Sequence, residues 1–515
     1  MSVAADLPDD PEALKAIVLA ARAEIATLKA INADAEARME RLTTLLKTLE
    51  RARYGRRSET LDPDQHAFAF EEIETGVAAI EANLAAANPT RVRTARPRKA
   101  LPGHLPRIEV VIEPDATPCA CGACDRVKIG EDVSERLDVV PAKFRVIVTR
   151  RPRYACKVCR EGVVQARAPA RLVDAALPTE ALLAHVAVSK YADGLPLYRQ
   201  EVIYARDGVE LSRSLMAAWM GRIGIELEPL AARVFHHIRA GHRIFADETR
   251  LPTLAPGRGK TKSAWLWTYA RDDRPFGGTD PPMVAYRFED SRGGECPLEH
   301  LAGFAGLLQV DGYAAYKRLA EPARPGGAVT LAACWSHLRR KFYELHVAGL
   351  SDTATWTVER MTALWRLEGE VRGQPAEARQ AVRAETSAPL VAELFARWEK
   401  ELGRIPGKSK LAEAIRYAIA RRADLERFLH DGRLDIDSNI VERAIRPQTI
   451  TRKNALFAGS DGGGNTWATI ATLLATAKLN GVDPHAWLTR TLERLAADWP
   501  NRLIDDLMPW NHKTA

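Results

Sequence analysis

Two apolar runs that each lead into an aspartate decide the fold of this chain: Arg243-Ile244-Phe245-Ala246-Asp247-Glu248-Thr249 and Gly306-Leu307-Leu308-Gln309-Val310-Asp311-Gly312-Tyr313. Each run predicts a β-strand that ends at its aspartate. A third carboxylate, Glu442, lies in Asp437-Ser438-Asn439-Ile440-Val441-Glu442-Arg443-Ala444-Ile445-Arg446-Pro447, which has a helical pattern. Two strand-end aspartates and one helical glutamate supply the oxygen ligands that Mg²⁺ prefers, and together they predict a two-metal site for phosphoryl transfer.

Strand patterns surround the two aspartates and then give way to helices. Further strands are expected at 265–271, 283–288 and 329–335. The stretch 337–432 is rich in Ala, Arg, Glu and Leu and is almost wholly helical in pattern. We therefore expect an α/β catalytic domain over 236–465 that carries an all-α insertion at about 337–432.

Glycines mark the end of this domain. The run from Gly459 to Gly464 predicts a flexible loop, because glycine disfavours both helix and strand interiors. A helix from about Thr466 to Leu479 follows and opens a C-terminal helical tail, 466–515.

Three helices are expected upstream of the first strand, in a region that we bound at 173–235. Pro178 and Thr179 precede the first helix, a second runs from Leu197 to Arg206, and Ser212 caps a third. A helix, a short turn with Gly208 and a capped helix are typical of a helix-turn-helix that binds DNA. Helical hairpins without that function share the pattern.

Five of the seven cysteines cluster between positions 119 and 159, inside a module that we bound at 108–172. Two pairs about 30 residues apart predict a structural zinc site of the zinc-ribbon type. The favoured ligands are Cys121, Cys124, Cys156 and Cys159, with Cys119 as the alternative in the first pair. Four protein ligands leave no open position for chemistry, so this zinc would be structural.

A heptad repeat precedes the cysteines, within the range 11–52. Apolar residues recur in unbroken steps of four and three from Leu14 to Leu49, with Asn32 at one core position. The period of 3.5 favours a leucine-zipper coiled coil and a parallel dimer, so we expect a homodimer or a higher oligomer. One amphipathic helix that packs on its own chain is the alternative.

Basic residues follow in a helical and proline-containing linker, 53–107. The candidates for DNA contact in this linker are Arg53, Arg56, Arg57, Arg91, Arg93, Arg96, Arg98 and Lys99. The segment is either a solvated tether or an arm that contacts phosphates.

Composition sets wide bounds. The 515 residues predict several domains, and a net charge of +7 allows a nucleic-acid partner without requiring one. No apolar run approaches the roughly 20 residues of a membrane span. The first residues lack the basic and apolar regions of a secretory signal, so we expect a cytoplasmic, nucleoid-associated protein without a membrane partner.

The chain resembles bacterial insertion-sequence transposases of the DDE class, and within them the IS66 family. The resemblance covers nearly the whole chain and rests on these stretches: 129–138 (IGEDVSERLD), 189–193 (SKYAD), 195–200 (LPLYRQ), 245–249 (FADET), 309–313 (QVDGY), 441–447 (VERAIRP) and 452–460 (RKNALFAGS). Cys334 and His337 resemble the family's Cys-x-x-His signature after the second aspartate. Pro118 departs from the usual first zinc pair, and Ser438 stands where asparagine is usual.

The resemblance implies an RNase H-like core in which Asp247 lies on the first strand, Asp311 on the neighbouring fourth strand and Glu442 on a later helix. It implies that these three residues hold two Mg²⁺ or Mn²⁺ ions and catalyse strand cleavage and strand transfer on double-stranded DNA, at the ends of the element and at the target. Arg443, Arg446, Arg452 and Lys453 are further candidates for DNA contact, and surface salt bridges are the alternative for Arg443 and Arg446. For His337 we favour a packing role over catalysis.

Two other functions fit parts of this pattern. A DNA-binding regulator without chemistry would have the zipper, zinc and helix-turn-helix modules, with incidental carboxylates. A DDE nuclease would cut without joining strands. Small accessory proteins encoded by the same element are possible partners in the transposase reading.

Overall fold

The computed structural model describes residues 10–11, 15, 18–19, 21–22, 144–151, 153–154, 164–165, 168–173, 178–255 and 260–512. The five clustered cysteines, the basic candidates from Arg53 to Lys99 and nearly all of the predicted coiled coil lie outside these residues. The account below concerns the compact unit that begins at Ile147.

Three helices precede the main sheet, at the positions that their caps predict. They are α3 (Glu180–Tyr191), α4 (Leu197–Ala205) and α5 (Arg213–Arg239). The hydroxyls of Thr179 and Ser212 each accept a hydrogen bond of 3.3 Å from a backbone N–H of the first turn. Helix α5 runs four residues past the expected limit of this region at 235, because its buried face continues past Pro229 as far as Ile238. Before these helices, β1 (Arg153–Tyr154) pairs with β2 (Val164–Gln165).

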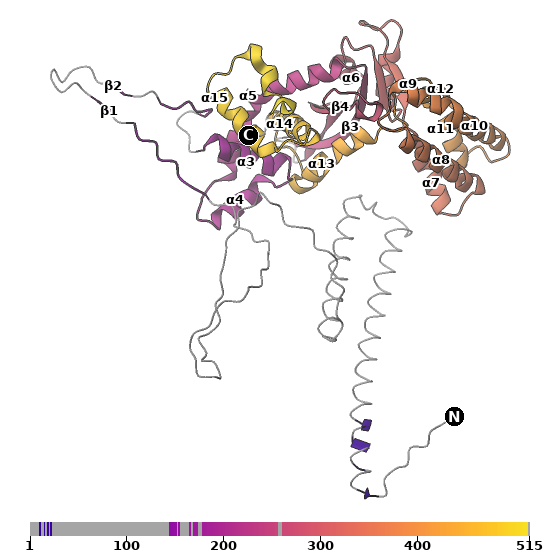
Figure 1. Cartoon of the computed structure of the whole chain (residues 1–515), viewed down its shortest axis with the longest axis horizontal. Helices are drawn as coiled ribbons and strands as arrows, with labels where there is room; N and C mark the ends of the chain where they lie inside the picture. Colours follow the sequence, from indigo (N-terminus) through magenta and orange to yellow (C-terminus); the bar gives the residue numbers. More distant parts are fainter. Residues whose placement is uncertain are drawn as a thin grey trace, which may run out of the picture. The chain divides into compact units, whose positions relative to one another are not determined.

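A mixed five-stranded sheet forms the centre of the unit (Figure 1). Its strands are β3 (Arg243–Leu254), β4 (Thr261–Arg271), β5 (Met283–Glu289), β6 (Leu307–Val310) and β7 (Thr330–Ala333). The spatial order is β5-β4-β3-β6-β7, with antiparallel pairing from β5 to β3 and parallel pairing from β3 to β7. The first and fourth of these strands are therefore neighbours, as expected.

The position of Asp247 corrects one expectation. The strand does not end at this aspartate but continues through seven further residues to Leu254. The reason is its partner β4, which pairs with β3 along the whole stretch from Phe245 to Leu254. Asp311, in contrast, directly follows the last residue of β6, as expected.

Helices fill the chain between Trp335 and His430. They are α7 (Trp335–Val347), α8 (Asp352–Glu370), α9 (Ala376–Val382), a π-helical turn (Arg383–Ser387), α10 (Ala388–Leu402), α11 (Lys410–Ile419) and α12 (Arg422–His430). They enclose a second hydrophobic core, which is separate from the core around the sheet. Figure 1 shows α8 to α12 gathered at one end of the sheet.

Buried charges join the two cores. Arg243 at the start of β3 is 1% exposed, and its Nη1 lies 3.5 Å from a carboxylate oxygen of Asp435. Asp435 also accepts a hydrogen bond of 2.8 Å from Arg379, which in turn lies 3.4 Å from a carboxylate oxygen of Glu368. Glu368 accepts two further hydrogen bonds from Arg383, of 2.7 Å from Nε and 2.6 Å from Nη2. This set of Arg243, Asp435, Arg379, Glu368 and Arg383 is called the buried charge network below.

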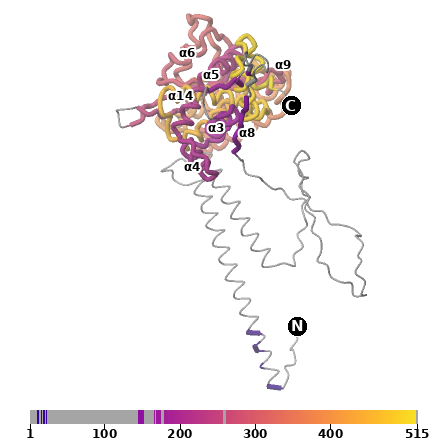
Figure 2. The backbone as a smooth tube through the Cα atoms, turned by 90° about the vertical axis from the view of Figure 1, so that its left-hand side faces the viewer, coloured from indigo at the N-terminus to yellow at the C-terminus, as the bar shows by residue number. Residues whose placement is uncertain are grey.

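Three helices complete the unit: α13 (Asn439–Ala455), α14 (Asp461–Leu479) and α15 (Pro484–Ala496). Figure 2 shows α14 grouped with α3 and α5. Helix α14 covers the edge strand β5, where the hydroxyls of Thr472 and Thr476 accept hydrogen bonds from the backbone N–H groups of Tyr286 and Val284 at 2.9 and 3.2 Å. The edge is thereby protected from pairing with another chain.

The predicted loop at Gly459–Gly464 is wrong from Asp461 onward, because α14 starts there. Ser460 caps the helix by accepting a hydrogen bond of 3.0 Å from Gly463 N–H. A β-carbon on Gly464 would lie 2.4 Å from the ring of Phe288, so this glycine permits close helix–sheet packing.

Short helical turns complete the described chain. They are α6 (Glu295–His300) and the 3₁₀ segments Arg274–Phe276, Ala314–Ala320, Asn501–Leu507 and Pro509–Asn511. In the described part of the chain, no helix has both the length and the apolar character needed to cross a membrane.

Candidate active site

The parallel pairing of β3 with β6 brings Asp247 and Asp311 to equivalent positions. Phe245 pairs with Gln309, and each aspartate lies two residues further along its own strand. Neighbouring strands are about 4.8 Å apart, and side chains two residues apart share a face. The two carboxylates are thus adjacent on one face of the sheet, and their electrostatic repulsion contributes to the raised pKa of Asp247.

Each aspartate uses one carboxylate oxygen for a local hydrogen bond. Asp247 Oδ1 accepts a hydrogen bond of 2.8 Å from the N–H of Glu248, and Asp311 Oδ1 accepts one of 2.7 Å from the N–H of Tyr313. Within the described residues, the second oxygen of each carboxylate has no hydrogen bond. The turn after Asp311 requires Gly312, which has φ +91° and whose added β-carbon would meet Arg421 Nε at 2.7 Å.

The carboxyl of Asp247 is easily protonated in the metal-free protein. Burial raises its pKa to about 7, and the charges of Glu248 and Asp311 add to the shift, while the Glu248 N–H and the charge of His337 oppose it. A nearby divalent cation would reverse these effects, because it favours the charged carboxylate.

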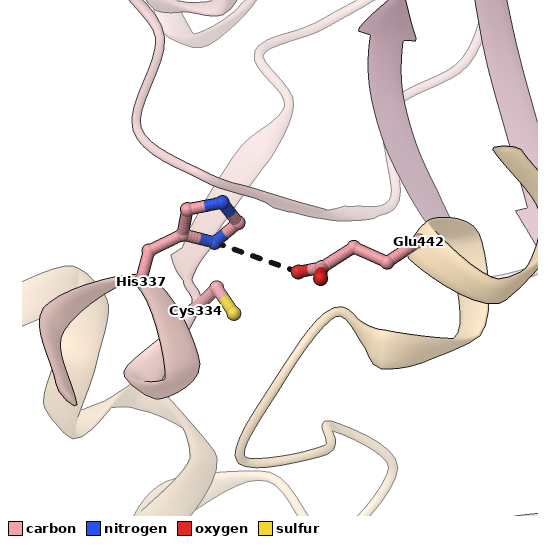
Figure 3. A group of neighbouring side chains, drawn as sticks. All are labelled: Cys334, His337 and Glu442. Carbon is pink, nitrogen blue, oxygen red and sulfur yellow. Dashed lines mark ion pairs between the residues drawn. The ribbon is translucent and has the colours of Figure 1, made fainter. Parts of the chain in front are cut away.

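Glu442 lies in the first turn of α13 and points toward the first turn of α7 (Figure 3). Its Oε1 is 3.7 Å from His337 Nδ1, and the possible ligand atoms of Glu442, His337 and Cys334 lie within 4.8 Å of one another. His337 Nδ1 is buried without a hydrogen bond among the described residues. The charge of His337 also acts on Asp247, so the histidine is within electrostatic range of a strand carboxylate as well as of Glu442.

Cys334 has a structural contact that explains its burial. Its sulfur accepts a hydrogen bond of 3.2 Å from the N–H of Ser438, at the residue before α13. Burial raises the pKa of Cys334 to about 11, so the protonated thiol is the stable form. A thiol is a poor metal ligand. This contact joins the starts of α7 and α13 and thereby helps to set the distance between His337 and Glu442.

The start of α13 is also held by Asp437. Its carboxylate accepts hydrogen bonds from both the backbone and side chain of Asn439, at 3.1 and 2.7 Å, and from Trp365 Nε1 at 2.9 Å. The hydroxyl of Ser438 accepts no capping hydrogen bond from the first turn of α13, and it donates instead to Glu442 Oε1 at 3.4 Å. The insertion helix α8 therefore helps to fix the helix that carries Glu442.

The predicted DNA contacts on α13 differ in their surroundings. Arg443, Arg446 and Lys453 are exposed. Arg452 is partly buried instead, and it donates to the hydroxyl of Thr249 at 3.0 Å and to the carbonyl of Arg250. Arg452 therefore attaches α13 to β3.

Several residues of the site have no clear local signal in the sequence. Glu248 is buried, and it accepts hydrogen bonds from Arg292 at 2.7 and 2.9 Å and from the hydroxyl of Tyr316 at 2.9 Å. From the insertion, Tyr417 donates 2.7 Å to the backbone carbonyl of Asp311. The motif Asp247-Glu248-Thr249 draws attention to Glu248, but its partners lie 44 and 68 residues away.

A mixed sheet with one aspartate on a strand, a second directly after the neighbouring parallel strand, and a glutamate on a helix that packs against the sheet is the architecture of a DDE transposase catalytic domain. Comparison with known families identifies the particular group. Residues 175–466 match the transposase IS66 family, and 472–510 match the IS66 C-terminal element. The chain belongs to the IS66 family of transposases.

The N-terminal segments match the same family. Residues 41–110 match its leucine-zipper segment, described as transposase C of IS166 homeodomain, and 117–160 match the zinc-finger binding domain of transposase IS66. The second match includes all five clustered cysteines. A zinc-finger domain suggests zinc, a leucine zipper suggests oligomerisation, and a DDE domain implies DNA binding and a divalent metal ion.

Close relatives occur in Sinorhizobium fredii. Uncharacterized protein y4qI is 60% identical over 99% of this chain and 98% of its own length. Uncharacterized protein y4jD is 42% identical over 98% of this chain and 97% of its own length. Uncharacterized protein y4hP is 36% identical over 91% of this chain and 88% of its own length. The likeness therefore extends over the full domain set rather than the catalytic domain alone.

Proposed function

We propose that this transposase binds the ends of its insertion sequence and catalyses both strand cleavage and strand transfer at one site formed by Asp247, Asp311 and Glu442. The observation that carries the proposal is the parallel register that sets Asp247 beside Asp311, each with one oxygen that makes no hydrogen bond among the described residues. The contact of Glu442 with His337, whose charge acts on Asp247, supports the assignment of the third carboxylate to this site.

These residues fit a pair of Mg²⁺ or Mn²⁺ ions, because hard cations prefer carboxylate oxygens. Bound there, the ions would activate the attacking oxygen and stabilise the leaving oxygen of an in-line displacement. The backbone N–H groups of Glu248 and Tyr313 orient the two aspartates, and the contact of Cys334 with Ser438 helps to position Glu442.

Two displacements at phosphorus complete the reaction. In the first, a water oxygen bonds to the phosphorus at the end of the element and the bond to the 3′-oxygen breaks. The leaving 3′-oxygen takes up one proton to become a hydroxyl, and the second water proton passes to solvent. In the second, the freed 3′-hydroxyl bonds to a target phosphorus, and the target's own 3′-oxygen leaves. No covalent enzyme intermediate is required, so one set of carboxylates serves both steps.

The remaining modules would assemble the DNA ends. We infer that the coiled coil joins two or more chains and that Cys121, Cys124, Cys156 and Cys159 hold a structural zinc ion, with Cys119 as the alternative ligand. Helices α4 and α5 would read bases, while the linker arginines and α13 would contact phosphates. Accessory proteins of the same element are further partners under this proposal.

Labelled duplexes that carry the terminal inverted repeats of the element test the proposal. Full-length protein with Mg²⁺ is expected to bind them, release a 3′-hydroxyl and join it to target DNA. Asp247→Asn should retain binding and lose cleavage. Glu399→Gln, which changes an exposed carboxylate of the insertion, is the matched control and should cleave normally.

The competing functions predict different products. Binding without cleavage by the wild-type protein would favour a regulator, and cleavage without joining would favour a nuclease. Cleavage by Asp247→Asn at the wild-type rate would overturn the site assignment.

A further inference from the structure

Helix α13 ends in a strained turn centred on Leu456. This residue has φ 69° and ψ −45°, and the N–H of Phe457 donates 2.9 Å to the carbonyl of Ala455, two residues back. The geometry is a γ-turn of the rare kind, which costs conformational free energy for any residue with a β-carbon. Glycine would relieve that cost, yet the chain has leucine here.

Packing does not account for the leucine. Leu456 is 68% exposed, and Phe457 is 38% exposed. Leu254 at the end of β3 is also exposed, at 40%. Strained residues whose side chains gain no stability from packing often have a functional role. The strained and exposed Leu456 therefore suggests a contact with a ligand.

The turn is fixed in place by the sheet. Ala458 N–H donates 2.8 Å to the carbonyl of Pro252, and Leu254 N–H donates 2.8 Å to the carbonyl of Ala458. Arg452 adds its bonds to Thr249 and Arg250, one turn earlier in α13. Leu456 and Phe457 therefore project from a rigid platform on the strand that carries Asp247.

A positively charged face leads from the carboxylates to this platform. Three exposed cations, Arg443, Arg446 and Lys453, and the exposed Ile450 follow one another at steps of three and four and so share one side of α13. A cationic face that ends in exposed apolar side chains suits a duplex whose phosphates lie along the helix and whose bases meet the apolar tip.

We propose that Leu456 and Phe457 form an apolar wedge that enters the DNA of the element's end and unstacks a base step there. This proposal rests on the proposed function, because the DNA must lie on the site of Asp247, Asp311 and Glu442. Leu456 lies 14 residues after Glu442, or about 21 Å along a helix. With about 3.4 Å per base pair, the wedge meets the duplex roughly six base pairs from the scissile phosphate.

Fluorescence of 2-aminopurine, placed at successive positions of the terminal-repeat duplex, tests the wedge in the full-length protein. Binding of the wild-type protein is expected to raise the fluorescence several-fold at a position near the sixth base pair and little elsewhere. Leu456→Ala/Phe457→Ala should abolish this rise and slow cleavage about tenfold. A duplex with a mismatch at the same position should restore cleavage by the double variant.

Two variants make the result specific. Leu350→Ala removes an equally exposed leucine of the insertion and should keep both the fluorescence and the cleavage rate. Leu456→Gly removes the side chain and relieves the turn, so it should fold at least as well as wild-type protein yet lose the fluorescence rise.

Other outcomes overturn the wedge. Wild-type protein that cuts DNA without a local fluorescence rise would refute the wedge and leave the proposed function standing. Wild-type protein that neither binds nor cuts would refute both. A change in oligomeric state of the double variant by light scattering, with unchanged fluorescence, would assign these side chains to a contact between chains instead.

Discussion

The hydroxyl of Tyr417 donates a hydrogen bond of 2.7 Å to the backbone carbonyl of Asp311. The donor belongs to α11 of the insertion and the acceptor directly follows β6, so this contact connects the helical insertion to a proposed catalytic aspartate. The ring of Tyr417 is in turn covered by Arg421, at 3.9 Å from guanidinium carbon to ring centroid.

Tyr417→Phe should slow cleavage by up to about tenfold with little loss of stability, because one hydrogen bond contributes about 1 kcal/mol. The cleavage rate and the denaturant midpoint measure the two effects. Tyr343→Phe, which alters an exposed ring of α7, is the control and should leave both unchanged. Equal rates for the two variants would show that the insertion does not influence Asp311.

Asp247 should make the metal-free protein less stable as pH rises. Its folded pKa of about 7 exceeds the ordinary value, so between about pH 4 and 7 the folded chain keeps a proton that the unfolded chain has released. The stability that this proton confers is fully present below about pH 4 and is lost as the pH rises to about 7. Asp247→Asn should therefore exceed wild-type stability by about 2 kcal/mol at pH 8 and much less at pH 5.

Urea unfolding at the two pH values, without divalent metal, measures that difference. Added Mg²⁺ should raise the midpoint of the wild-type protein at pH 8 and leave that of Asp247→Asn nearly unchanged. A pH-independent difference between the two proteins would contradict the raised pKa.

Arg292 should matter to stability mainly through Glu248. Its loss leaves a buried carboxylate with Tyr316 as its remaining hydrogen-bond donor, and Arg292→Met should cost about 2 kcal/mol. Glu248→Gln removes the buried charge, so Arg292→Met should cost much less stability in a protein that already carries Glu248→Gln. Additive costs in this double-mutant cycle would mean that the pair is not coupled.

Arg383 is expected to be among the most sensitive positions of the insertion. Arg383→Ala leaves Glu368 buried with only the longer contact to Arg379, at 3.4 Å, and should destabilise the protein by about 3–5 kcal/mol. Arg360→Ala, which breaks an exposed pair with Glu393, should cost no more than about 1 kcal/mol. Thermal unfolding of Arg383→Ala and Arg360→Ala measures the difference. Similar unfolding midpoints for the two variants would contradict this prediction.

The cysteine cluster predicts about one zinc ion per chain in protein as purified. Cys156→Ser should lower the zinc content, whereas Cys119→Ser should preserve it if Cys121 is the ligand in the first pair. Elemental analysis of the purified variants decides between the two cysteines. Zinc-free protein that is fully folded would contradict the structural role.

The sequence predicts those features that local pattern controls. Alternating apolar residues mark β4 and β5, and Thr179 and Ser212 mark the starts of α3 and α5 because a capping hydroxyl acts within its own turn. Pairing across long separations has no such signal. The contacts of Glu248 with Arg292, of Asp311 with Tyr417 and of Arg243 with Asp435 depend on how distant elements meet.

Composition also misleads where tertiary packing selects the residue. The glycines at 462–464 resemble a loop in sequence, but Gly464 is needed where α14 touches Phe288. Similarly, Asp247 resembles a strand terminus because the apolar run stops there, although pairing with β4 carries the strand onward.

The buried charge network has an evolutionary consequence. An insertion whose interface is apolar can be exchanged between relatives with modest cost, since hydrophobic surfaces tolerate imperfect partners. Here a transplanted insertion would have to bring Arg379, Arg383 and Glu368 into register with Arg243 and Asp435, or leave an ion without its counterion inside the protein. Recombination between transposase genes should therefore preserve the segment from β3 to α13 as one inherited block.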